Sequence, residues 1–294
     1  MNAIWLAAAA AVGWGAADYF GGASRGRTPV LVIVAVSELL GLCLLIPVLV
    51  ARGVPPPGNP RLLLAAVAGA GVTIELSLIY LALSRGEGFI TAATGALGAA
   101  IGATVGLIAG DPLNALVGAG LACALVGGGV SAWTPGGDRT RGGGNRWKGP
   151  LRGAALSAGA AVGVAMMLIS FRAAGRVDPY WATAVEHAST GLCAILVELA
   201  VSRRPLRGRL PRLPQVRGLA LVALAGVAGD LAYASASQHG TLSVISAVSS
   251  LYPVTTIALG IAVQGQRPNR VQVAGIALAL IGAAVLGSAT AALA

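Results

Sequence analysis

The sequence predicts an all-α integral membrane protein with ten transmembrane helices, arranged as two inverted five-helix repeats. Its composition, its ten long apolar stretches and a weak internal repetition predict this fold. Of the 294 residues, 56% are hydrophobic and only 10% are charged, and the mean hydropathy is +0.81. Soluble domains carry about a quarter charged residues, so a soluble chain of this composition could not cover its surface. The composition therefore excludes a soluble enzyme, a disordered protein and a collagen-like repeat.

Ten apolar stretches have the length that a membrane-spanning helix needs. About 20 residues, rising 1.5 Å each, cross a hydrocarbon core of about 30 Å. The stretches do not alternate at a period of two, which excludes the strands of a membrane barrel. The predicted spans are Ile4–Phe20, Pro29–Ala51, Arg61–Ser84, Gly88–Gly110, Pro112–Trp133, Leu151–Phe171, Pro179–Val201, Gly218–Gln238, Gly240–Gln264 and Val271–Ala291.

The basic residues lie between these spans and predict the orientation of the chain. Sixteen of the twenty follow odd-numbered spans, and four follow even-numbered spans. The positive-inside rule places the loops with more Lys and Arg in the cytoplasm, so both termini are expected outside the cell (inner or plasma) membrane. There the basic residues would lie beside anionic lipid headgroups. This accounts for the net charge of +10 and predicts no nucleic-acid partner.

Short matches in order along the chain indicate a repeat. Gly41-Leu-Cys43 recurs as Gly191-Leu-Cys193, and the glycine-bounded run Gly120–Gly127 parallels Gly275–Gly282. Further matches keep the same offset of about 150 to 155 residues. An odd number of helices in each half inverts the second half relative to the first, which is common in secondary transporters.

The repeat divides the chain into three parts. We expect the first five-helix repeat in residues 1–133 and the second in residues 151–294. Between them, residues 134–150 form a Gly/Arg-rich stretch with no apolar period, which is typical of a linker.

A resemblance to a known family appears at this point. Trp14 and Gly15, the Ser-Leu-Tyr-Pro run at Ser250–Pro253, and the polar segment Gly265–Pro268 resemble an EamA-type protein. This is the ten-helix branch of the drug/metabolite transporter superfamily. The family often has Gly-Glu-Arg where this chain has Gln266, and the first-half counterpart, Gly110–Pro112, departs further. Many members place both termini in the cytoplasm, whereas the arginine bias here favours the opposite. The resemblance implies efflux or exchange of small metabolites, amino acids or drugs.

The acidic residues are the main candidates for chemistry. Six of the ten fall inside predicted spans, in which the only basic residues, Arg61 and Arg152, stand at the span ends. A carboxylate at mid-membrane costs about 2.5–3.5 kcal/mol on insertion scales, so it is expected to face a wet cavity, find a partner or take up a proton.

Counting residues from the span ends groups these acids by depth. Three from the first half lie about 6–14 Å below one membrane face, and two from the second half lie about 10–12 Å from the opposite face. Such a convergence predicts a central site between inverted repeats. A structural polar contact is the alternative role for each of them. The predicted substrate- or proton-binding residues are Glu38, Glu75, Glu186, Asp230, Asp18 and His187.

Other residues are expected to line the cavity or to pack helices. Hydroxyl side chains gather around the proline of the ninth span, and two tyrosines occupy matching positions of the repeats. Glycines spaced four apart let helix backbones approach closely. The predicted cavity-lining residues are Tyr80, Ser249, Tyr252, Pro253 and Tyr233, with core packing as the alternative for the two matching tyrosines, Tyr80 and Tyr233. The predicted packing glycines are Gly98, Gly102, Gly106 and Gly110.

The sequence lacks the common motifs of enzymes and cofactor sites. The sequence has no phosphate-binding loop for ATP and no His-Glu-x-x-His for zinc. Its three cysteines, Cys43, Cys123 and Cys193, have no metal-ligand spacing. We therefore expect no enzyme activity, no cofactor and no metal.

These observations together predict a secondary active transporter that exports a small-molecule substrate by alternating access with proton coupling, as a monomer or homodimer. One alternative is an uncoupled facilitator or lipid-carrier flippase. Another is a non-transporting membrane receptor or assembly protein.

Overall fold

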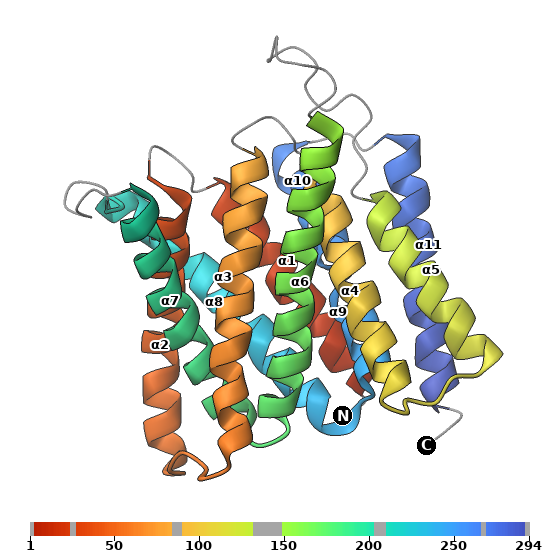
Figure 1. Ribbon diagram of the computed structural model, residues 1–294, viewed down its shortest axis with the longest axis horizontal. Coiled ribbons are helices and arrows are strands. Elements are labelled where there is room, and N and C mark those ends of the chain that lie inside the picture. The colour runs from red at the N-terminus through yellow and green to blue at the C-terminus, as the bar shows by residue number, and fades with distance from the viewer. Residues whose placement is uncertain are drawn as a thin grey trace.

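A computed structural model describes residues 3–23, 28–83, 90–131, 149–202, 210–265 and 269–291. These residues form helices and no strand, as Figure 1 shows. The elements are α1 (Ala3–Ala23), α2 (Val30–Arg52), the 3-10 helix η1 (Pro60–Leu63), α3 (Leu64–Leu83), α4 (Ile90–Ile108), α5 (Ala115–Ser131), α6 (Gly149–Gly175), α7 (Pro179–Ser202), α8 (Leu213–His239), α9 (Leu242–Ser249), α10 (Tyr252–Gln264) and α11 (Arg270–Ala291).

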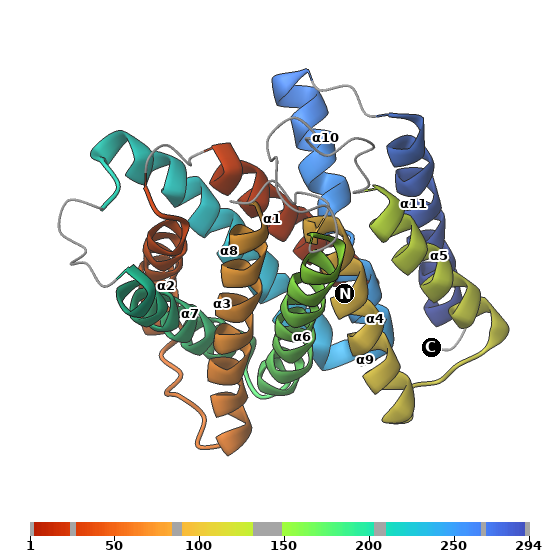
Figure 2. The same ribbon diagram turned by 45° about the horizontal axis from the view of Figure 1, so that its top comes forward.

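The helices run side by side as a bundle, and α1 begins at the same end at which α11 ends (Figures 1 and 2). Large apolar side chains on its outside are exposed, among them Trp5, Val50 and Ile108. Lipid tails can cover such a surface and water cannot. The chain is a multi-pass membrane protein, as its long apolar helices support.

Seven helical stretches in the described part are long and apolar enough to cross a membrane. The expected ten spans therefore meet this criterion in part. The apolar cores of α4, α5 and α11 are shorter: Leu97–Ile108, Ala115–Val130 and Arg270–Leu286.

The ninth predicted span, Gly240–Gln264, is two helices rather than one. α9 ends at Ser249, and α10 begins at Tyr252 with Pro253 in its first turn. Proline lacks a backbone N–H and its ring clashes with the carbonyl four residues earlier, so a helix cannot continue through it unchanged. Neighbouring hydroxyls bind backbone carbonyls around the break: Ser249 Oγ donates to the Ile245 carbonyl at 2.7 Å. The break lies in the middle of the bundle.

Helices α5 and α11 are in close contact through small residues on both sides. A Cβ built on Gly127 would lie 2.7 Å from the Ala279 Cα and 2.8 Å from the Gly275 carbonyl oxygen. A Cβ on Gly282 would lie 2.8 Å from both the Ala124 Cα and the Gly120 carbonyl oxygen. On each helix, one glycine thus faces an alanine Cα and a glycine carbonyl of the other helix. The contact is thus reciprocal.

Two other helix pairs, α1 with α8 and α6 with α3, make matching contacts in the same way. A Cβ on Gly13 of α1 would lie 2.6 Å from the backbone nitrogen of Gly229 in α8. A Cβ on Gly163 of α6 would lie 2.8 Å from the backbone nitrogen of Glu75 in α3. Glycine is needed at Gly13 and Gly163 because a larger side chain would push these backbones apart.

The predicted glycine ridge of α4 divides into two parts. Gly98 faces Val164 of α6, and Gly102 and Gly106 face the α9 residues Ser246 and Ser243. Gly110 was expected to continue this ridge, and that prediction is wrong. α4 ends at Ile108, and Gly110 has a φ of +98°, with nothing within 4 Å of a Cβ built on it. It serves the turn after the helix, where glycine has little steric cost.

Most of the predicted linker, residues 134–150, lies outside the described residues. Its last two residues belong to α6, which begins at Gly149.

Candidate functional site

A cavity of about 140 Å³ lies inside the bundle, between the helices of the first and second halves. Its walls come from α1, α2, α3, α6, α7 and α8, and from Ser250 and Tyr252 at the break between α9 and α10. None of its lining residues is Lys or Arg. Five predicted acids, on five different helices, line it: Asp18, Glu38, Glu75, Glu186 and Asp230.

The acids at the two ends of this cavity differ in exposure. Asp18 is exposed and lies five residues before α1 ends at Ala23. Glu186 is only 2% exposed and lies seven residues after α7 begins at Pro179, at the opposite end of the bundle. Asp18 therefore marks the mouth of the cavity and Glu186 its floor.

His187 joins two of these carboxylates near the floor. Its Nδ1 contacts Glu38 Oε2 of α2, and its Nε2 lies 3.2 Å from Asp230 Oδ2 of α8. The imidazole is 1% exposed and thus sealed from solvent. The other oxygen of Asp230, Oδ1, accepts a 2.8 Å hydrogen bond from Trp14 Nε1 of α1. Four helices thus meet at one polar cluster.

Glu186 belongs to the same cluster but faces the cavity. Adjacent residues on a helix point about 100° apart, so Glu186 and His187 present different sides of α7. Thr190, one turn further on, donates a 2.6 Å hydrogen bond to Glu186 Oε1. Glu186 Oε2 is buried and has no hydrogen-bond partner within the part of the chain that the structure describes. This leaves one carboxylate oxygen available at the cavity floor.

Asp18 and Glu75 form a second pair of acids, nearer the mouth. Across the described part of the chain, neither carboxylate has a hydrogen bond or an ion pair. Tyr252, on α10, lines the same region of the cavity. The mouth therefore carries two carboxyl groups that have no basic partner among the described residues.

Of the remaining predicted cavity residues, Tyr233, Ser249 and Pro253 are not among the described residues that line the cavity. Tyr233 is fully buried in the core, where its ring stacks on Phe171 and its hydroxyl donates to the Leu168 carbonyl at 2.7 Å. Ser249 binds the backbone of its own helix, and Pro253 begins α10 without lining the cavity. Tyr80 lies on α3, with its side chain outside the described residues. Local hydroxyl-to-backbone bonds explain Ser249, since serine in a helix commonly bonds the carbonyl four residues back.

Two residues of the cluster were missed as site residues. Trp14 had supported only the family resemblance, although a tryptophan in the middle of a span offers an N–H that must find an acceptor. Thr190 follows Glu186 by four residues, which is the spacing at which helical side chains meet. That spacing could have identified it.

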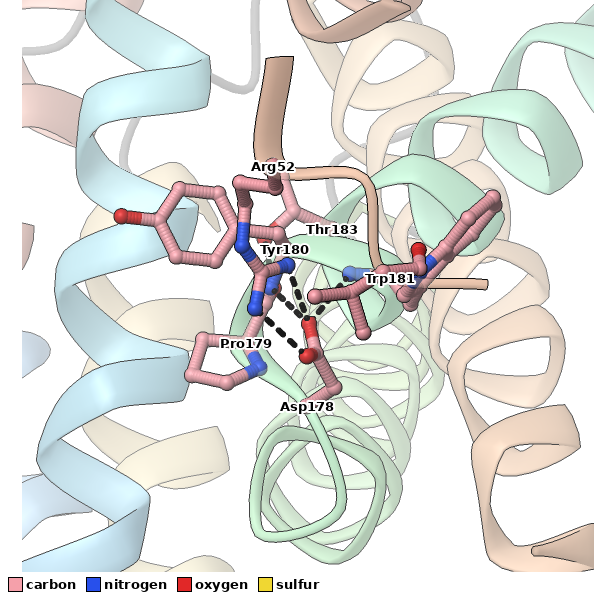
Figure 3. A network of polar contacts seen from close by, with 7 residues as sticks. Arg52, Asp178, Pro179, Tyr180, Trp181 and Thr183 are labelled. Atoms are coloured by element: carbon pink, nitrogen blue, oxygen red, sulfur yellow. Dashed lines mark hydrogen bonds and ion pairs between the residues drawn. The ribbon is translucent and has the colours of Figure 1, made fainter. Parts of the chain in front are cut away.

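The bundle end opposite the mouth is held together by a polar network, shown in Figure 3. Arg52, the last residue of α2, makes two hydrogen bonds of 3.1 and 2.9 Å to the carboxylate of Asp178, which directly precedes α7. The same carboxylate accepts from the backbone N–H groups of Tyr180 and Trp181, as a helix N-terminus favours. Partial burial of Asp178 raises its pKa, but Arg52 and these N–H groups outweigh it and lower the pKa overall. Asp178 is thus held as a carboxylate.

Two further contacts close this end. The Arg172 guanidinium of α6 donates to the Gly240 carbonyl, between α8 and α9, at 3.2 Å. Asp111, which follows α4, accepts from the Ser243 backbone N–H at 2.8 Å. Loops and helix ends from both halves are therefore tied together at the floor side.

Comparisons with known proteins agree with this architecture. No curated protein matches the sequence. A solved crystal structure of a protein has the same fold, with a TM-score of 0.73 and 20% sequence identity. The match covers 96% of this chain and 95% of that chain. A sequence model of the EamA-like transporter family matches residues 151–288, which confirms the resemblance predicted from the sequence. The second half of the chain is thus similar to the EamA-like transporter family, a family of membrane transporters within the drug/metabolite transporter superfamily.

Proposed function

We propose that this protein is a proton-coupled secondary transporter that exports small cationic or zwitterionic solutes. Protons and solute compete for the carboxylates of Glu38, Glu75, Glu186 and Asp230. The observation that carries the proposal is the gathering of five acids, from five helices, around one cavity whose described lining residues include no Lys or Arg.

The electrostatics of the cavity support a cation or protons as its occupant. Several carboxylates at close quarters in a low-dielectric interior cannot all remain charged and unpaired. Among the described residues, His187 is the one basic partner of Glu38 and Asp230, and Asp18 and Glu75 have none. The remaining negative charge is offset either by bound protons or by a positively charged solute. Coupling requires that the protons and the solute exclude each other from the site in this way.

The size of the cavity favours a small solute over a lipid carrier. Its volume of about 140 Å³ is close to that of an engineered apolar cavity of about 150 Å³ that binds benzene. Amino acids and small amines are of this order, whereas a lipid carrier is much larger. The proposal therefore sets the flippase alternative aside.

Alternating access is proposed to move two inverted halves around this cavity. The reciprocal packing of α5 with α11, and the matching glycine contacts of α1 with α8 and α3 with α6, support such a pairing of repeats. The mouth lies at the end where α1 ends, and the segments that follow odd-numbered predicted spans, the first of which follows α1, carry more Lys and Arg in the sequence. If those loops face the cytoplasm, this conformation takes up solute from the cytoplasm, in keeping with export.

The test begins by comparing the metabolites exported by cells with and without the protein, which supplies a substrate. Transport of that substrate is then measured in proteoliposomes with an imposed pH gradient. Glu38→Gln and Asp230→Asn keep the side-chain size and remove the charge, so both should abolish the response to the gradient. Unchanged transport and pH dependence in both variants would refute the proposal. If the protein moves no solute from a broad set but copurifies with a tightly bound partner, a receptor or assembly role replaces it.

A further inference from the structure

The floor of the cavity has the features of a metal site that no spacing in the sequence predicts. Glu38, Glu186 and His187 each offer one ligand atom, and these three atoms lie within 4.8 Å of one another. Glu186 and His187 are consecutive residues of α7, and Glu38, far from them in the sequence, lies on α2, which packs side by side with α7. We propose that Glu38, Glu186 and His187 bind a divalent transition-metal ion such as Zn²⁺ at the cavity floor.

The free oxygen of Glu186 points to a ligand beyond a simple acidic cluster. Glu186 is 2% exposed, it lines the cavity, and its Oε2 has no hydrogen-bond partner, while Thr190 holds the other oxygen. A buried carboxylate oxygen without a partner is costly, so native proteins rarely leave one unless something binds there. A metal ion at the cavity floor would supply that partner.

The side chains next to the proposed ligands orient them by hydrogen bonds, as is common in metal sites. A metal-bound imidazole almost always gives its other nitrogen to a carboxylate or carbonyl, which fixes the ring. With His187 Nδ1 beside Glu38 as the ligand atom, Nε2 lies 3.2 Å from Asp230 Oδ2. Trp14 holds the second oxygen of Asp230 in turn. His187 is thus oriented before any ion arrives.

The mix of donors selects the class of metal. One imidazole nitrogen with two carboxylates suits Zn²⁺ and its first-row neighbours, whereas Ca²⁺ and Mg²⁺ prefer oxygen ligands alone. Zn²⁺ bonds are about 2.0–2.2 Å long, so a modest rotation of the two glutamates would bring the ligands into range. Both glutamates line the cavity, which leaves a coordination position open to water or solute.

The binding test uses the full chain purified in detergent, and it does not depend on transport. Equilibrium dialysis against Zn²⁺, with the metal counted by mass spectrometry, should give one ion per chain. Glu186→Gln and His187→Gln should each weaken binding at least tenfold, with thermal unfolding confirming that each variant is folded. Glu75→Gln is the matched control: it removes a cavity carboxylate outside the ligand set, so it should keep the stoichiometry and most of the affinity.

A spectroscopic readout separates ligation from mere attraction of charge. Cu²⁺ bound at this site should show splitting from one nitrogen in its electron paramagnetic resonance spectrum, and His187→Gln should remove it. If His187→Gln does not fold, Glu186→Gln and Glu38→Gln decide the question by dialysis. The proposal is overturned if the folded wild-type chain binds no Zn²⁺, or if Glu75→Gln weakens binding as much as Glu186→Gln. Metal binding without pH-driven transport would refute only the proposed function, and the converse would refute only the metal site.

Discussion

Trp14 Nε1 donates a 2.8 Å hydrogen bond to Asp230 Oδ1, and this bond connects α1 of the first half to α8 of the second half. The Trp14 ring also lies 5.3 Å from the ring of Tyr233, so the indole is held by packing as well as by its N–H. Because Asp230 in turn lies against His187, the indole indirectly positions the histidine at the centre of the polar cluster.

Trp14→Phe should therefore disturb the site more than its loss of volume suggests. The ring contact with Tyr233 remains possible, but the Asp230 oxygen loses its donor in a buried place. We expect a loss of about 1–3 kcal/mol in the free energy of unfolding and a severalfold fall in transport rate. Thermal unfolding in detergent and transport in proteoliposomes check this. Trp5→Phe, at a 71% exposed position on the same helix, is the control and should change stability by less than about 0.5 kcal/mol. Equal effects of the two substitutions would contradict the role given to Trp14.

The Arg52–Asp178 pair should make stability depend on pH in one direction only. The folded-state pKa of Asp178 is lowered, so the pair stabilises the fold above the ordinary aspartate pKa of about 3.9. That stabilisation is lost as the pH falls through the lowered folded-state value. Asp178→Asn should cost about 1 kcal/mol at pH 7, because the pair is partly exposed, and its difference from wild type should shrink in acid.

Thermal unfolding of wild type and Asp178→Asn between pH 7 and pH 3 measures this difference. Arg52→Lys is the matched control, since it keeps the charge and loses the two-pronged geometry, so it should show only part of the loss. A difference that grows in acid would contradict the lowered pKa.

The same pair should also hold the floor side of the cavity closed. Gly226 lines the cavity, and a Cβ there would meet only His187, at 4.0 Å, so Gly226→Cys should be accommodated. In a background with Cys43, Cys123 and Cys193 changed to Ala, a membrane-impermeant maleimide should label this cysteine from the mouth side. Adding Asp178→Asn should raise labelling from the opposite side up to about fivefold, which corresponds to about 1 kcal/mol. Intact cells and inverted vesicles separate the two sides. Identical labelling with and without Asp178→Asn would show that the ion pair is not part of a gate.

The contact of α5 with α11 should reject a methyl group at two glycines, whereas a glycine of α5 that does not face α11 closely should tolerate one. Gly127→Ala and Gly282→Ala would each place a methyl group against the backbone of the facing helix, so each should cost about 1–3 kcal/mol in the free energy of unfolding. Gly118→Ala, also on α5, meets only Leu113 Cδ1 at 3.6 Å and should stabilise the helix by about 0.5–1 kcal/mol. Thermal unfolding of the three variants decides. If all three behave alike, the close approach of the two backbones is wrong.

Much of the helical layout could be predicted because the signals are local. Apolar length locates the helices, although the break of the ninth span before Pro253 was not predicted. The gathering of Asp18 and Asp230 around one cavity followed from depth alone, since charges in a membrane seek a wet interior. Their functional role stays a prediction.

The details of the site could not be predicted in this way because they depend on contacts between distant segments. Glu38 and His187 meet because α2 packs on α7, and nothing near either residue in sequence indicates that contact. Tyr233 was expected at the cavity, but the aromatic core beside it offered both stacking and a carbonyl acceptor. Gly110 continues the four-residue spacing of the glycines in the sequence, but α4 ends before it, at Ile108.

The central claim is that protons and solute compete for the same carboxylates, and proton movement driven by solute tests it most directly. Proteoliposomes loaded with the identified substrate and a pH-sensitive dye are diluted into substrate-free buffer without an imposed pH gradient. Outward solute flow through the wild-type protein should drive protons inward and acidify the lumen. Glu38→Gln and Asp230→Asn should abolish this signal. Solute efflux from wild-type vesicles with no change in the lumenal pH would contradict the account.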